Sequence, residues 1–98
     1  MNISQPAFAG TLESGDVQIR IEPNELGGIE LVLDSTVEQQ FGKAIRELVL
    51  QTLSAMTVND AKIIIEDKGA LDCVIKARVQ AVVLRACDNK EINWSTLS

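Results

Sequence analysis

One run of three consecutive isoleucines, Ile63 to Ile65, constrains the fold more than any other feature of this chain. The run is β-branched and wholly apolar, and Lys62 and Glu66 bound it. A continuous apolar run of this length indicates a strand that is covered on more than one side, because a half-exposed strand alternates apolar and polar residues. We therefore predict a central strand at residues 63–65, with other elements beside it and over it.

Two alternating segments precede this run. Apolar and polar residues alternate over 17–22 and again over 29–34, which is the pattern of half-buried strands. Pro23 ends the first segment, and the stretch 24–28 carries the Asn and Gly residues of a turn. Since consecutive strands with a short connection usually pair, we expect an antiparallel hairpin here.

Two segments have the apolar spacing of amphipathic helices. The first runs over about 36–56, and its start has the form of a capping box, with Ser35 as N-cap and Glu38 at the third helical position. The second runs over about 70–86. We interpret the apolar stripes as core rather than as a cofactor site. They comprise Val37, Phe41, Ala44, Ile45, Leu48, Val49, Leu53 and Met56, then Leu71, Val74, Ile75, Val79, Val82 and Val83.

These elements predict one small α+β domain over residues 1–98. The order is β-β-α-β-α, a two-layer domain with a three-stranded sheet and two helices on one face. If strands 29–34 and 63–65 are parallel, the helical crossover between them should be right-handed. Residues 1–16 are expected to form a mobile arm, and residues 87–98 a polar tail that Trp94 either pins to the body or leaves loose.

Charge and composition exclude several classes of function. The net charge of −5 argues against nucleic acid and against anionic membrane surfaces as partners, and it permits docking onto basic proteins. No run approaches 18 apolar residues and the first residues lack a basic segment, so we expect a cytoplasmic protein without a membrane span or signal peptide.

Conventional catalytic and metal sites are poorly supplied. The chain has no histidine, which excludes Ser-His-Asp and Cys-His arrangements and removes the usual general base near neutral pH. Cys73 and Cys87 lie 14 positions apart in one predicted helix, about 21 Å, far beyond the reach of a disulfide. Two cysteines without histidine make a poor zinc set, and we expect buried or half-buried structural thiols and no metal.

Two serines compete as a site of modification. Asp34-Ser35-Thr36 resembles the Asp-Ser-Leu site of fatty-acid acyl carrier proteins, but the leucine is missing and Ser35 already has a role as N-cap. On this interpretation Ser35→Ala costs roughly 1 kcal/mol of stability and leaves function intact. The second serine, Ser14, stands before Gly15 in a turn-prone pair that by itself carries no special role.

Three blocks in the same order give Ser14 its context. They are Gln5-Pro6-Ala7 with Ala9-Gly10-Thr11-Leu12-Glu13-Ser14-Gly15-Asp16-Val17, then Ser35-x-Val37-Glu38-x-Gln40-Phe41-Gly42 with Ala44-Ile45-Arg46, and then Asp67-Lys68-Gly69-Ala70-Leu71-Asp72-Cys73 with Ala77-Arg78. Together they resemble the citrate lyase acyl carrier family over residues 3 to about 86. Nothing after Ala86 adds to the resemblance.

The resemblance implies a carrier rather than an enzyme. In that family the serine of the Glu-Ser-Gly-Asp stretch, here Ser14, is joined through a phosphodiester to phosphoribosyl dephospho-coenzyme A, whose thiol carries acetyl and citryl groups. The implied partners are the citrate lyase α (acyltransferase) and β (citryl lyase) subunits, a prosthetic-group transferase and an acetate ligase. Gly15 would leave the serine accessible. Glu13 and Asp16 would keep the segment exposed and steer it toward a basic pocket.

Two alternatives remain open. The carrier subunit of malonate decarboxylase resembles this family and uses the same prosthetic group, so only activity in reconstituted complexes separates the two. A protein-interaction domain without a cofactor would instead show an unmodified intact mass in its native host.

Overall fold

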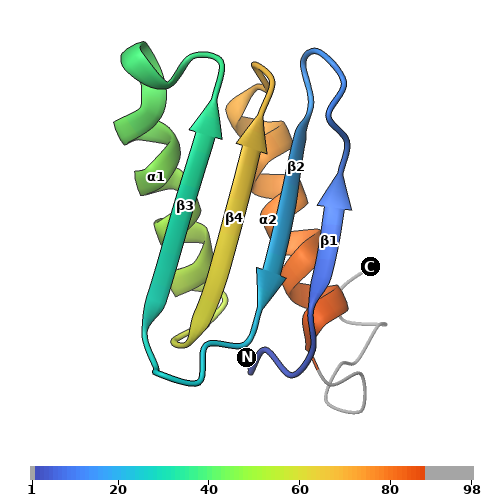
Figure 1. Cartoon of the computed structure of the whole chain (residues 1–98), viewed down its shortest axis with the longest axis vertical. Helices are drawn as coiled ribbons and strands as arrows, with labels where there is room; N and C mark the ends of the chain where they lie inside the picture. Colours follow the sequence, from blue (N-terminus) through green and yellow to red (C-terminus); the bar gives the residue numbers. More distant parts are fainter. Residues whose placement is uncertain (1, 88–98) are drawn as a thin grey trace.

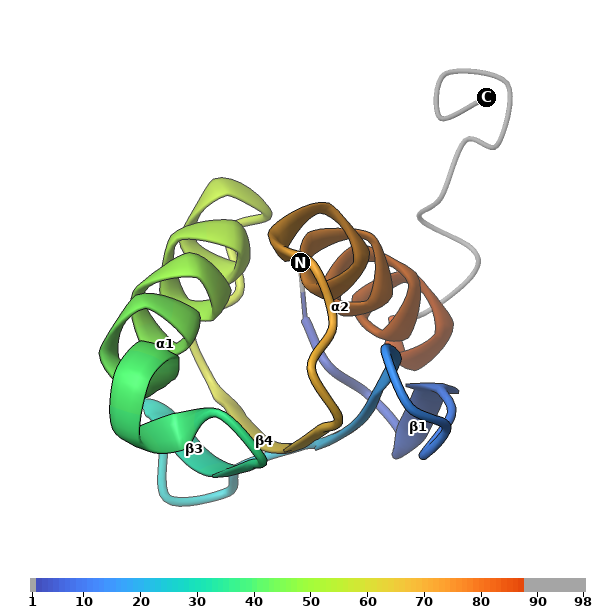
Figure 2. The ribbon, with the colours of Figure 1, turned by 90° about the horizontal axis from the view of Figure 1, so that it is seen from above.

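The computed structural model describes residues 2–87, which form a sheet with two helices packed on one of its faces (Figures 1 and 2). The α+β class and the two helices on one face are confirmed, but the sheet has four strands instead of three. In chain order the elements are β1 (Ala7–Gly10), β2 (Val17–Glu22), β3 (Ile29–Ser35), α1 (Glu38–Ala55), β4 (Ala61–Asp67) and α2 (Asp72–Ala86). The predicted tail after Cys87, Trp94 included, lies outside the described residues.

The isoleucine run lies in β4, and its central place is confirmed. The strand order is β1-β2-β4-β3, and β4 pairs antiparallel with β2 and parallel with β3. Ile63 and Ile65 point into the core, whereas the side chain of Ile64, on the other face, is only half-buried. The second face of the sheet is therefore uncovered by helices, contrary to the expectation from the apolar run.

The predicted hairpin of residues 17–22 and 29–34 is wrong, because β4 lies between these two strands. The connection over 23–28 has to span two strand spacings, about 10 Å, and six residues do so easily. It is fixed beneath the start of β4, where the Asp60 carboxylate accepts from Gly28 N at 2.6 Å and Ala61 N donates to Gly28 O at 3.0 Å. A short connection favours pairing of the two strands that it joins. The apolar strand β4, however, is best buried with a neighbour on each side, and this preference places it between β2 and β3.

The predicted mobile arm is also corrected. Residues 7–10 form β1, which pairs antiparallel with β2 at the sheet edge. Before it, Ser4 N and Gln5 N donate to Ala86 O at 2.9 and 3.2 Å, which ties the start of the chain to the end of α2. The sequence Ala-Phe-Ala-Gly is short and rich in small residues, so its alternation gave no clear strand signal.

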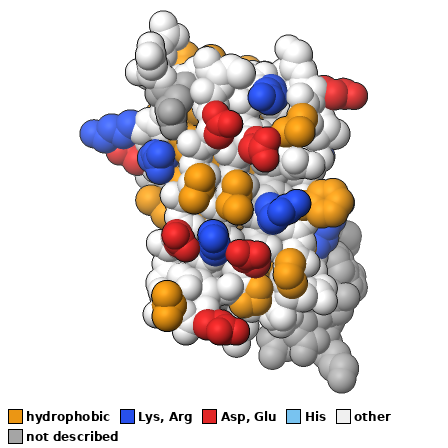
Figure 3. Space-filling model, viewed as in Figure 1, with side chains coloured by type: hydrophobic (Ala, Val, Ile, Leu, Met, Phe, Trp, Pro, Cys, Tyr) orange, Lys and Arg blue, Asp and Glu red, His pale blue; other side chains and the backbone are white. Residues whose placement is uncertain are grey.

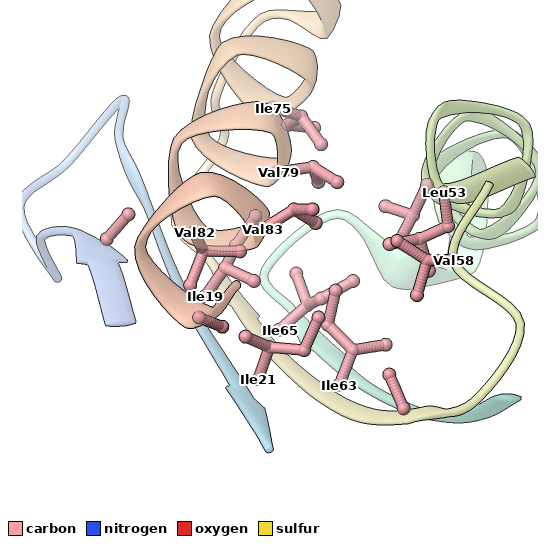
Figure 4. Close-up of a cluster of buried hydrophobic side chains, with 14 of the residues drawn as sticks. Ile19, Ile21, Leu53, Val58, Ile63, Ile65, Ile75, Val79, Val82 and Val83 are labelled. Atoms are coloured by element: carbon pink, nitrogen blue, oxygen red, sulfur yellow. The ribbon is translucent and has the colours of Figure 1, made fainter. Parts of the chain in front are cut away.

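The core fills the space between the sheet and both helices (Figure 4). The inward isoleucines of β2 and β4 meet side chains of α2 and of the C-terminal half of α1. The strands contribute Ile19, Ile21, Ile63 and Ile65, α2 contributes Ile75, Val79, Val82 and Val83, and α1 contributes Val49 and Leu53. Both helices begin two residues later than predicted. Cys87 is buried and Cys73 is exposed, so the expectation of a buried or half-buried thiol is wrong for Cys73.

Candidate functional site

Ser14 lies at the tip of a tight turn between β1 and β2. Asp16 N donates to Glu13 O at 3.0 Å, so Ser14 and Gly15 are the two central residues of a β-turn. Gly15 has a φ of +82°, which glycine adopts readily at the third position of such a turn. Ser14 is exposed, and a Cβ on Gly15 would meet no atom within 4 Å. The Ser14 hydroxyl is therefore open to approach.

The turn is bonded to the connection between β4 and α2. Gly15 N donates to Lys68 O at 2.7 Å, and Lys68 N donates to Asp16 O at 2.9 Å. Figure 1 shows this connection, the β1–β2 loop and the start of α1 at one end of the molecule. These two backbone bonds join residues 53 and 52 positions apart, and they hold Ser14 on a fixed turn instead of a loose arm.

The Asp16 carboxylate organises the base of the turn. It accepts from Thr11 Oγ1 at 2.7 Å and from Val17 N at 2.7 Å. Arg78 of α2 adds two bonds, from Nε at 3.3 Å and from Nη2 at 3.2 Å. The Thr11 hydroxyl, then the Val17 amide, and then Arg78 lower the pKa of Asp16 from 3.8 to about 2. Asp16 therefore stays ionised and ties the loop to α2.

A second carboxylate, that of the buried Asp67, joins the neighbouring segments. Its side chain is 1% exposed and accepts from Ser35 Oγ at 2.8 Å and from Ala70 N at 2.9 Å. Its backbone oxygen accepts from Thr36 N at 3.2 Å. Asp67 thus links the end of β3 with the start of α2, next to the segment that holds the Ser14 turn.

The predicted capping box at Ser35 is wrong. The N-cap of α1 is Val37, and no side chain caps this helix. Ser35 ends β3 instead; its hydroxyl accepts from Val37 N at 3.1 Å and donates to Asp67. Ser35 still has a structural role, because its hydroxyl is half-buried and already committed to two hydrogen bonds.

An apolar groove of about 620 Å³ opens between the first turns of α1 and α2, beside Lys68. Phe41 and Leu71, expected in the core, line it and are 54% and 71% exposed. The remaining lining residues are Val37, Ala44, Ile45, Gly69, Ala70, Asp72 and Cys73.

The structure separates the predicted site residues by role. Ser14 and Gly15 are exposed at the tip, and the Glu13 side chain is exposed beside them. The Asp16 side chain is 17% exposed and turned toward Thr11 and Arg78, so it is poorly placed to steer an approaching partner. The predicted flexibility of the segment gives way to a fixed turn.

Sequence reasoning missed Thr11, Lys68 and Arg78 as parts of this site. Arg78 left a signal, because it is a charged residue among the inward positions of α2, between Ile75 and Val79. Lys68 left none, because it contributes through its backbone groups.

The arrangement suits covalent modification of Ser14 from outside. The described residues contain no group of three or more acidic, histidine or cysteine side chains able to hold a metal. Among the helices of residues 2–87, none combines the length and apolar character required to span a membrane. An exposed hydroxyl on a rigid turn can bear a large substituent without any change in the fold.

The chain is similar to known proteins over nearly its full length. The family model described as the malonate decarboxylase delta subunit matches residues 4–86. The citrate lyase acyl carrier protein of Vibrio cholerae serotype O1 is 74% identical over all 98 residues of both chains. Citrate lyase acyl carrier protein 2 of Salmonella paratyphi A is 53% identical over 99% of this chain and 100% of its own.

A solved structure supports the fold. One chain of a Pseudomonas malonate decarboxylase hetero-tetramer superposes with a TM-score of 0.66 and 22% identity, covering 89% of this chain and 93% of that one. At this identity the likeness concerns the fold alone. The sequence identity to the carrier proteins extends over the full length and shows the family as well as the fold. This chain belongs to the citrate lyase acyl carrier protein family.

Proposed function

We propose that this chain is the acyl carrier subunit of a citrate lyase, with Ser14 as the point of attachment of its prosthetic group. The observation that carries the proposal is the exposed Ser14 hydroxyl on a fixed turn, in a chain 74% identical to a citrate lyase acyl carrier protein. The group is phosphoribosyl dephospho-coenzyme A, bound through a phosphodiester to Ser14 Oγ. When bound, it supplies a thiol on which acyl groups are carried as thioesters.

The residues of the chain have a supporting role in this function. Gly15 leaves the approach to Ser14 open for a transferase. Asp16, Thr11 and Lys68 hold the turn still, so that the attachment point keeps one position relative to the body of the domain. Tethering makes each acyl transfer effectively intramolecular, with effective concentrations on the order of millimolar.

The catalytic groups would belong to partner subunits. On this proposal the α subunit exchanges acetyl for citryl, and the β subunit cleaves the citryl thioester to oxaloacetate. A prosthetic-group transferase and an acetate ligase prepare the carrier beforehand, and all of these steps take place in the cytoplasm. This chain contributes the attachment serine and no catalytic residue.

Intact mass from the native host tests the attachment. Wild-type protein from cells fermenting citrate should carry a single adduct, and Ser14→Ala should carry none. Ser54→Ala is the matched control, because Ser54 is another exposed serine and lies on α1. Equal adduct masses in wild type and Ser14→Ala would refute attachment at Ser14.

A malonate decarboxylase carrier is the second candidate, because the matching family model has that description and the fold is shared with a chain of that complex. Reconstitution separates the two. The loaded chain should support citrate cleavage with citrate lyase α and β subunits, and should fail to support decarboxylation with malonate decarboxylase subunits. The reverse result would favour the second candidate.

A further inference from the structure

The helix-free face of the sheet carries an ordered pattern of side chains. The strand registers pair Phe8 with Arg20, Arg20 with Ile64, and Ile64 with Val32, so these four residues form one row across all four strands. We call them the central row. They point away from the core, since their neighbours along each strand are the inward-facing residues.

The central row is unusual for a solvated sheet face. Phe8 is 61% exposed and Val32 is 46% exposed, and Ile64 lies between Val32 and Arg20. A sheet face that only meets water normally carries polar residues at such positions. Exposed apolar side chains that gather on one face of a domain mark sites of interaction.

Arg20 has no hydrogen bond or ion pair with any other described residue. Shallow hollows lie on both sides of it, one beside Phe8 and Glu22 and the other beside Ile64 and Glu66. Aromatic residues and arginine are the types that most often dominate binding energy at protein interfaces. An unpaired guanidinium between apolar neighbours is suited to a carboxylate on a partner.

Acidic residues flank the central row on both sides. The row toward the Ser14 end contains Glu66 and Asp34, and the row on the other side contains Glu22, Lys62 and Glu30. The face thus has four carboxylates against two cations, and Lys62 is already 3.9 Å from Glu22. Figure 3 views this face and shows hydrophobic and basic side chains in a band between acidic ones.

We propose that this face is a docking surface for a partner protein that presents an apolar ridge, with basic side chains on both sides and a carboxylate opposite Arg20. The ridge packs along the central row, and its basic flanks meet the two acidic rows. The inference deepens the proposed function and rests on it, since it takes the partner to be a subunit of the same citrate lyase assembly. Docking here leaves the Ser14 turn, at the end of the sheet, free to carry its substituent.

A second copy of this chain fits the face poorly. The face carries four carboxylates against two cations, so its net charge is negative. Two copies stacked through this face would bring together surfaces of the same net sign, which disfavours self-association.

Binding of the full chain to recombinant citrate lyase α and β subunits, followed by sedimentation, tests the proposal. Val32→Glu and Arg20→Glu should each raise the dissociation constant by about tenfold or more, as expected for residues at the centre of an interface. Higher salt should weaken wild-type binding, since charge pairs contribute to it. The controls are Leu50→Glu and Lys43→Glu on α1, which make the same charge changes at exposed positions and should leave binding within about twofold.

Two results would overturn the docking surface. One is unchanged binding of both central-row variants. The other is an isolated wild-type chain that sediments as a dimer, together with a monomeric Val32→Glu, because the face would then bind a second copy. The wild-type chain is purified from the native host, and its Ser14 adduct mass is measured on the same sample. If the adduct is missing but Val32→Glu still weakens binding to the α and β subunits, the carrier function alone is refuted and the docking surface stands.

Discussion

At the scale of single residues, Asp16 is the group that fixes the turn containing Ser14. Its carboxylate receives donors from Thr11, the Val17 backbone and Arg78, and its pKa is lowered from 3.8 to about 2. A carboxyl group with a lowered pKa in the folded state stabilises the fold above its ordinary pKa. That contribution is lost as the pH falls from about 4 through about 2. On acidification, the turn should therefore stay in place until the pH falls well below the ordinary pKa of an aspartate.

A carboxyl NMR titration measures this directly. The pKa of Asp16 should be close to 2, and it should rise both in Thr11→Val and in Arg78→Gln, because the Thr11 hydroxyl and Arg78 each lower it. Asp16→Asn should remove the corresponding change of stability with pH. An unchanged pKa in either variant would mean that the replaced side chain does not stabilise the ionised carboxylate.

Ser35 gives a second prediction at this scale. Its hydroxyl donates to Asp67, whose side chain is 1% exposed, so Ser35→Ala removes a donor from a buried carboxylate. Loss of a hydrogen-bond partner by a buried polar group costs about 1–3 kcal/mol, more than the roughly 1 kcal/mol expected for a lost N-cap.

Urea unfolding of Ser35→Ala measures the loss, with Ser54→Ala as the exposed control. The control should stay within about 0.5 kcal/mol of wild type. Equal stabilities of the two variants would contradict the role of Ser35 as the donor to Asp67. The adduct at Ser14 should persist in both.

At the scale of elements, the β1–β2 hairpin depends on Gly10. Its φ is +89°, and a Cβ there would lie 1.8 Å from Val17 O, inside the backbone of the opposite strand. Gly10→Ala should therefore cost about 3 kcal/mol or more, because it adds a backbone clash to an unfavourable φ.

Gly15→Ala separates these two effects. Gly15 has a similar φ of +82° but open space around it, so its replacement should cost only about 1 kcal/mol. Urea midpoints of the two variants give the comparison. If both lose the same stability, the clash at Gly10 is relieved by movement of the strand.

Elements with a strong local pattern were predictable from the sequence. The 3.6-residue spacing of both helices and the alternation in 17–22 survive in the structure, because each segment buries most of the face that its pattern indicates. Phe41, Ala44 and Leu71 are the exposed exceptions. The pairing of the strands was not predictable in this way. The position of β4 between β2 and β3 depends on contacts between residues more than 30 positions apart, which no local pattern records.

The candidate site likewise combines features that the local sequence indicates with features that depend on distant contacts. Ser14 and Gly15 were identified through a resemblance between families, and the turn itself through the Ser-Gly pair. The bonds of Arg78 to Asp16 join residues 62 positions apart, so neither segment alone indicates them. The fixed geometry of the turn thus appears only once the fold is known.

At the scale of the whole molecule, the sheet separates stability from recognition. Its inner face supports the core under both helices, and its outer face holds the central row. The strand β4 contributes to both, since Ile65 and Ile64 are adjacent in sequence and point to opposite faces.

Truncation of these two isoleucines tests that separation with the same chemical change. Ile65→Ala leaves a cavity in a fully buried site and should lower the free energy of unfolding by about 3–4 kcal/mol. Ile64→Ala removes a half-buried side chain and should cost less than about 1.5 kcal/mol. The effects on binding to the α and β subunits should have the opposite order. Ile64→Ala should bind these subunits more weakly than wild type does. Ile65→Ala should bind normally in conditions where it is folded. Unfolding in urea and binding by sedimentation measure the two quantities. A loss of binding in Ile65→Ala that matches Ile64→Ala would mean that the two faces of the sheet are not independent.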